Sequence, residues 1–134
     1  MERYPRVRLL AVVGLLCAAD TGLTLIGQPV AYWAPDYSAA VEANPLAFPF
    51  LARGPWVFVG LAVGWWGLLV GLVLSVRHPL ADWSAALVGV GHAVGGGNWL
   101  ARSGPWGWLA AVGFLLVAAA ILRTSWPCGL RTMK

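Results

Sequence analysis

A carboxylic acid, Asp20, lies inside a stretch of the chain that is otherwise apolar enough to span a bilayer, LLCAADTGLTLIG (residues 15–27). A charged side chain at the centre of a membrane helix costs roughly 2.5–3.5 kcal/mol on insertion scales, so it usually faces protein or water and often marks function. Thr24 follows one helical turn later on the same face. Asp20 is therefore the first residue to consider for chemistry.

Other polar residues are predicted to share the outer half of the membrane with Asp20. At 1.5 Å per residue, Asp20 lies about 10 Å and His92 about 14 Å below the outer ends of their predicted spans. The loop after the first span carries an E-x-N-P motif that could cover this pair from outside. We expect a candidate ligand-binding cluster that opens toward the outer leaflet and contains Asp20, Thr24, Glu42, Asn44, His92 and Asn98.

These residue types permit three kinds of behaviour. Asp20, Glu42 and His92 are candidate ligands for a divalent metal, which would activate water for hydrolysis of a lipid or peptide. The same three side chains could instead relay protons or cations through an oligomer. A hydrogen-bonded Asp20–His92 pair could also do no more than fix the register of two helices, since such contacts contribute under about 1 kcal/mol on average.

The sequence favours a protein that is not an enzyme, and we assign no catalytic residue. No serine stands in a GxSG motif, and the chain has no Walker loop, Rossmann fingerprint or haem-binding CxxCH. Cys17 and Cys128 form no CxxC and predict neither a disulfide nor a cysteine metal site. We expect no cofactor and a polar cluster that stabilises the helices and offers a site for a small ligand, lipid headgroup or partner helix. A metal-dependent intramembrane hydrolase and transport through an oligomer remain the alternatives.

Composition places the chain in the lipid bilayer. Of its 134 residues, 60% are hydrophobic and 10% are charged, whereas soluble domains carry about 25% charged residues. The length leaves room for about four spans of ~20 residues and no separate soluble domain. The basic residues flank the apolar runs instead of gathering in one patch, which argues against a nucleic-acid partner.

The apolar runs predict an all-α membrane bundle of four transmembrane helices in a single domain, at about 7–27, 56–76, 81–101 and 106–122. The outer loop 28–55 is too polar to span and too aromatic to be a free linker. It predicts a short interfacial segment, with a helix in YSAAVEA capped by Asp36 or Ser38 and with LAFPFLARGP lying along the headgroups. Asp82 or Ser84 is placed to cap the third span.

The distribution of Lys and Arg predicts that both termini are cytoplasmic. The two residues assigned to the outer side are Arg53 and Arg102. The seven assigned to the inner side are Arg3, Arg6, Arg8, Arg77, Arg123, Arg131 and Lys134. Tryptophans are expected at both interfaces, whereas Trp65 and Trp66 fall in the middle of a span and need a packing partner.

The second span carries its glycines on one face. Gly60, Gly64, Gly67 and Gly71 follow an i, i+4, i+7, i+11 spacing that contains GxxxG twice. Such small faces let membrane helices approach closely. The face predicts packing either within the chain or against a second copy or partner membrane protein, and the sequence leaves both open.

The order of the polar motifs resembles an uncharacterised family of small prokaryotic membrane proteins with several spans. The resemblance covers about residues 9–100 and rests on D-x-x-x-T at Asp20 and Thr24, on E-x-N-P from Glu42, and on Asn98. It implies a compact helical domain in the cytoplasmic membrane of a prokaryote and supplies no activity. The second helix of that family tends to carry a lysine, whereas the corresponding span here has none.

Overall fold

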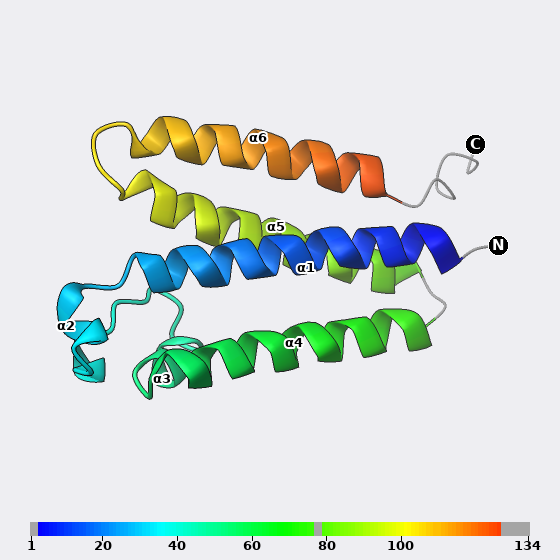
Figure 1. The fold of residues 1–134 in the computed structure, drawn as a ribbon. Coiled ribbons are helices and arrows are strands. Elements are labelled where there is room, and N and C mark those ends of the chain that lie inside the picture. Colours follow the sequence, from blue (N-terminus) through cyan, green and yellow to red (C-terminus); the bar gives the residue numbers. More distant parts are fainter. Residues whose placement is uncertain (1–2, 77–78, 127–134) are drawn as a thin grey trace.

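The computed structural model describes residues 3–76 and 79–126, and all regular structure in these ranges is helical. Four long helices, α1 (Arg3–Ile26), α4 (Pro55–Ser75), α5 (Pro79–Ala101) and α6 (Gly107–Ser125), lie side by side and alternate in direction (Figure 1). Three short elements, α2 (Val30–Trp33), the 3-10 helix η1 (Tyr37–Ala39) and α3 (Phe48–Leu51), lie together at one end. The predicted all-α class is confirmed.

Three helices in the described part of the chain, α1, α4 and α6, are long and apolar enough to cross a membrane. They indicate a membrane protein. The predicted third span forms the 23-residue helix α5, which is not one of these three. Its lower hydropathy follows from its composition, because Asp82, His92, Asn98 and several glycines replace apolar side chains.

Proline and glycine set the helix boundaries. Helix α1 ends shortly before Pro29, because the residue before a proline disfavours helical geometry. Helix α4 begins at Pro55, where a missing N–H costs nothing, directly after Gly54 with a φ of 120°. A side chain at Gly54 would be strained by that φ and would press on the Tyr37 ring at 3.2 Å.

Helices α1, α5 and α6 form the closely packed part of the molecule. Helix α1 makes its most extensive contact with α5, and α5 packs next most extensively on α6. Gly89 of α5 permits the close approach, because a Cβ there would lie 3.1 Å from Leu122 and 3.2 Å from Val13. The buried side chains at this centre include Leu9, Val13, Leu16, Ala85, Ala93, Ala118 and Leu122.

Helix α4 is attached less extensively, on the side of α1 away from α6 (Figure 1). Trp66 finds the packing partner that its mid-span position requires, since its indole rests on Gly14 of α1. The glycine face of α4 has no such partner. No described atom of another element lies within 4 Å of the Cβ positions at Gly60, Gly64, Gly67 or Gly71. This face therefore does not pack within the described chain, and the intramolecular interpretation of its spacing is wrong.

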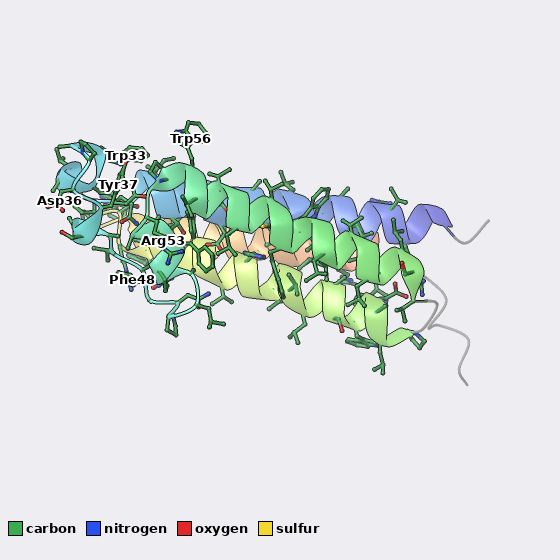
Figure 2. All side chains as sticks on the ribbon, turned by 90° about the horizontal axis from the view of Figure 1, so that it is seen from below. Trp33, Asp36, Tyr37, Phe48, Arg53 and Trp56 are labelled. Carbon is green, nitrogen blue, oxygen red and sulfur yellow. The ribbon has the colours of Figure 1, made fainter. Side chains whose placement is uncertain are left out.

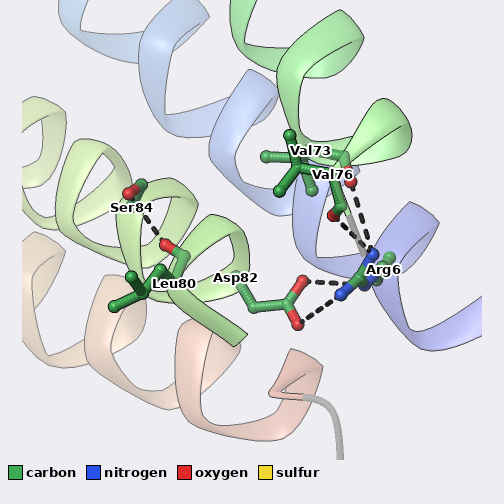
Figure 3. Close-up of polar contacts among 6 residues, drawn as sticks. All are labelled: Arg6, Val73, Val76, Leu80, Asp82 and Ser84. Carbon is green, nitrogen blue, oxygen red and sulfur yellow. Dashed lines mark hydrogen bonds and ion pairs between the residues drawn. The ribbon is translucent and has the colours of Figure 1, made fainter. Parts of the chain in front are cut away.

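An ion pair joins three helices at the end of the molecule where α1 begins (Figure 3). Nε of Arg6 lies 3.0 Å from Oδ1 of Asp82, and its NH2 group donates to Oδ2 at 3.2 Å. The same guanidinium donates to the carbonyl of Val76 at 3.0 Å, just after α4 ends. The ion pair is well formed although Oδ1 of Asp82 has no aligned hydrogen bond of its own.

The expectation that Asp82 or Ser84 caps α5 is wrong. The helix begins at Pro79, so both residues lie inside it. Asp82 pairs with Arg6 from the first turn, where a negative charge also complements the helix dipole. Ser84 donates its hydroxyl to the carbonyl of Leu80, as helical serines commonly do.

Candidate functional site

Asp20 of α1 and His92 of α5 meet side by side. Nδ1 of His92 lies 2.8 Å from Oδ2 of Asp20, and the two side chains are only 23% and 20% exposed. Residues 72 positions apart in the chain thus share a polar contact between two long helices. The depth estimate from helix rise predicted that the two residues lie at similar depth. In the structure they also lie on facing sides of their helices and are therefore in contact.

Gly95 provides the seat for this pair. The three atoms nearest to its Cβ position all belong to Asp20, with Oδ1 at 2.7 Å and Oδ2 at 2.9 Å. Any side chain at this position would occupy the space of the carboxylate. The next residue, Gly96, lies against two neighbouring helices. A Cβ at this position would lie 3.2 Å from Leu23 of α1 and 3.2 Å from Phe114 of α6. The Cβ position of Gly97 meets Leu115 of α6, so the Gly95-Gly96-Gly97 run fits α5 closely to both α1 and α6.

Cys17 joins the pair from one turn earlier in α1. The thiol is free and 5% exposed, and it interacts with the imidazole of His92. A thiol, an imidazole and a carboxylate in this order can activate a cysteine nucleophile in an accessible site. Here the sulfur is buried.

Thr24 and Gln28 continue the polar face of α1 toward the end that leads into the loop 28–55. Thr24 is 2% exposed, and its carbonyl accepts a 2.9 Å hydrogen bond from the Gln28 amide. Gln28 also bonds both backbone groups of Val41, donating to its carbonyl at 2.9 Å and accepting from its N–H at 2.8 Å. This buried amide ties the outer loop to the end of the first helix.

The remaining predicted cluster residues do not join Asp20 and His92. Glu42 accepts the backbone N–H of Asn44 at 2.8 Å, and the Asn44 side chain accepts that of Leu46 at 3.0 Å. Asn98 lies exposed on α5. No hydrogen bond or ion pair among the described residues links any of the three to the Asp20–His92 pair. Local turn geometry accounts for the loop motif.

The predicted metal ligands do not converge. Across residues 3–76 and 79–126, no three His, Cys, Asp or Glu side chains gather closely enough to hold a metal ion. Asp20 and His92 supply two ligands at most, and Glu42 belongs to the loop turn. The donor set thus falls short of the three protein ligands that a catalytic zinc site uses.

Three residues to which the structure gives polar partners, two in this region and one at the end where α1 begins, were missed by reasoning from sequence. Gln28 was not singled out, although an amide beside Pro29 at the end of the first predicted span has both a donor and an acceptor to place. Cys17 lies three residues before Asp20, a spacing that puts both on one helix face. Arg6 was counted only for its charge. In each case the residue type carried the signal, while its partner lay far away in the sequence.

Comparison with known proteins adds no relative: no family model, curated protein or solved structure matches this chain. The resemblance through D-x-x-x-T and E-x-N-P stays a prediction. The class that the fold defines is a small helical membrane protein, and its function rests on the site alone.

Proposed function

We propose that this chain is a non-enzymatic, four-span membrane protein in which the Asp20–His92 pair holds the first span against the third. The contact of 2.8 Å between Nδ1 and Oδ2, with the carboxylate seated on Gly95, carries the proposal. Both side chains are largely buried, which suits a contact that holds two helices together. We call this contact the Asp20–His92 lock. The exposed fifth of each leaves room for a small polar ligand or a lipid headgroup.

The assignment of α5 as a span is supported by where its polar groups lie. Asp82 pairs with Arg6 and His92 with Asp20, so the two ionisable side chains of α5 both contact α1. Polar residues in membrane helices are tolerated where they face protein partners. The length of α5 also suits a span, because its 23 residues extend about 34 Å and a hydrocarbon core is about 30 Å thick.

The proposed orientation has both termini in the cytoplasm of a prokaryotic cell. Arg6, Arg8 and Arg123 lie at the end where α1 begins and α6 ends, and Arg53 and Arg102 lie at the other end. An even number of spans returns the chain to its starting side. The excess of arginine at the first end supports its assignment as the inner end.

A double-mutant cycle tests the lock. Asp20→Asn and His92→Gln each keep the size of the side chain while weakening the pair. We expect the free energies of unfolding in detergent micelles to show a coupling of about 0.6–1.7 kcal/mol, the range for polar contacts in membrane proteins.

Two outcomes would contradict the proposal. Additive effects, within about 0.3 kcal/mol, would mean that the pair does not hold the helices together. A loss of proton or cation flux in liposomes with unchanged unfolding would favour the transport alternative instead.

A second copy of the chain is the partner that we propose for the glycine face of α4. The open space over all four glycines favours it, because close approach of two small faces drives association in lipid. In a background with both native cysteines replaced, Gly64→Cys should form an intermolecular disulfide on oxidation in native membranes. Leu116→Cys, on an exposed position of α6, is the control. Equal disulfide yields at both positions, or no disulfide at either, would mean that lipid and not a second copy covers this face.

A further inference from the structure

The segment between the first two spanning helices is a folded unit. Its centre is Tyr32, fully buried with Leu51 and Phe58, and the phenol donates to the Leu51 carbonyl at 3.1 Å. Burial, with Tyr37 adding to it, raises the pKa of the Tyr32 phenol above its ordinary value. Together with the Gln28 bonds to Val41, these contacts fix residues 28–54 in one arrangement, which we call the outer cap.

The outer cap and the helix ends beside it nevertheless expose many apolar side chains. Because its own small core is already closed, the cap cannot bury them by folding further inward. The large apolar residues exposed at this end of the molecule are Ile26, Val30, Trp33, Val41, Leu46, Phe48, Trp56, Trp106 and Trp108. A surface of this kind marks contact with a membrane or a protein partner.

The exposed apolar side chains, which we call the apolar ring, lie on opposite sides of the cap, and a polar residue marks its tip. In Figure 2, Trp33 and Trp56 lie on one side of the molecule and Phe48 on the opposite side, whereas Asp36 lies at the extreme end. The carboxylate of Asp36 caps η1 by accepting from the N–H of Ser38. Apolar groups on opposite sides suit a surrounding medium better than a single partner, which would contact one side.

We propose that the outer cap is immersed in the lipid headgroup region, where its ring of apolar side chains binds the interface and its tip reaches water. The cap lies at the ends of α1 and α4, which it connects, and both of these helices are apolar enough to span. Tryptophan prefers this depth because its ring is apolar and its N–H is polar. Arg53 and Arg102, exposed at the same end, are available to lipid phosphates.

This inference rests on membrane insertion of the long helices and is independent of the Asp20–His92 lock. Single cysteines for spin labelling are introduced in a background with Cys17→Ala and Cys128→Ala. Val30→Cys and Phe48→Cys report on the apolar ring, Ser38→Cys on the tip, and Leu116→Cys on a spanning helix. The protein is placed in vesicles of phosphatidylethanolamine and phosphatidylglycerol, and collision rates are measured with oxygen, which enters lipid, and with a water-soluble nickel chelate.

The oxygen-to-nickel ratio should be highest at residue 116, intermediate at 30 and 48, and lowest at 38. Ratios at 30 and 48 as low as that at 38 would place the cap in water and overturn the inference. Protection from both reagents at 30 and 48 would mean that protein covers the ring, which would also overturn it. A low ratio at 116 would contradict membrane insertion itself, so the two failures are distinguishable. Unchanged unfolding midpoints in micelles identify the variants that keep the fold.

Discussion

Helices α4 and α5 carry glycines at comparable density but surround them differently. In α5, the Cβ positions at Gly89, Gly95, Gly96 and Gly97 all lie within 3.4 Å or less of side chains from α1 or α6. In α4, all four glycines face open space in the described chain. Glycine spacing therefore shows where a close approach is possible, whereas the shape and polarity of the facing helix decide whether it happens.

The two helices also differ in what holds them. The Asp20–His92 pair and a closely packed apolar centre fix α5 between α1 and α6. Helix α4 has fewer attachments, with Trp66 on Gly14 near its middle and Arg6 at its end. Local opening is expected to begin where buried contacts are few, so α4 should separate before α5 does.

The largest expected effect is a difference between matched glycine substitutions. Gly89→Leu forces a side chain into space where a Cβ alone lies 3.1 Å from Leu122, and overpacking of this kind should cost about 3 kcal/mol or more. Gly67→Leu makes the same chemical change on the open face of α4 and should stay within about 0.5 kcal/mol in the monomer. Unfolding in micelles by denaturant measures both.

A milder version keeps this test informative if Gly89→Leu fails to fold. Gly89→Ala adds one methyl group and should still be destabilising relative to Gly67→Ala. Equal effects at the two positions would mean that α4 and α5 are packed alike.

The next effect concerns the end of the molecule where α1 begins and Arg6 attaches α4. Arg6→Gln leaves Asp82 without its ion pair and the Val76 carbonyl without its donor, and we expect a loss of about 2 kcal/mol. Arg8→Gln, at an exposed position two residues later in α1, should have little effect. Hydrogen exchange should rise first in the last turn of α4. Equal exchange in α4 and α5 would contradict the idea that α4 depends more on this contact.

Two adjacent tryptophans give a comparison within α4 itself. Trp66→Ala removes the indole that rests on Gly14 and should cost about 1–2 kcal/mol, because this side chain packs directly on α1. Trp65→Ala makes the same change at a more exposed position and should cost less. Tryptic sensitivity of the loop before α4, at Arg53, provides a second measure of detachment. A larger effect at Trp65 would mean that α4 is held through the face that carries Trp65, and not through the face that meets Gly14.

The difference between α4 and α5 also explains which features could be predicted from the sequence and which could not. Apolar runs and their prolines predicted the long helices, because length, hydropathy and the missing N–H of proline act locally. Helix rise brought Asp20 and His92 to one depth for the same reason. Glu42 and Asn44 were misplaced because their side chains bond the backbone two residues away. No local rule relates a glycine face to its neighbour, so the open face of α4 and the filled face of α5 looked alike.

The smallest expected effect distinguishes two reasons for a glycine in a helix: a side chain of the neighbouring helix that fills the space of a Cβ, or close approach of the two backbones. Gly95→Ala puts a methyl group where the Asp20 carboxylate lies, whereas Gly91→Ala, one turn earlier, meets nothing within 4 Å. We expect Gly95→Ala to be about 1 kcal/mol less stable than Gly91→Ala, since the carboxylate must move and strain its contact with His92. Asp20→Ala removes all three atoms nearest to the Gly95 Cβ position. In that background the difference between the two alanine variants should fall within about 0.5 kcal/mol, the limit expected for independent sites. A difference that persists would mean that backbone approach between α1 and α5, and not the carboxylate of Asp20, requires glycine at this position.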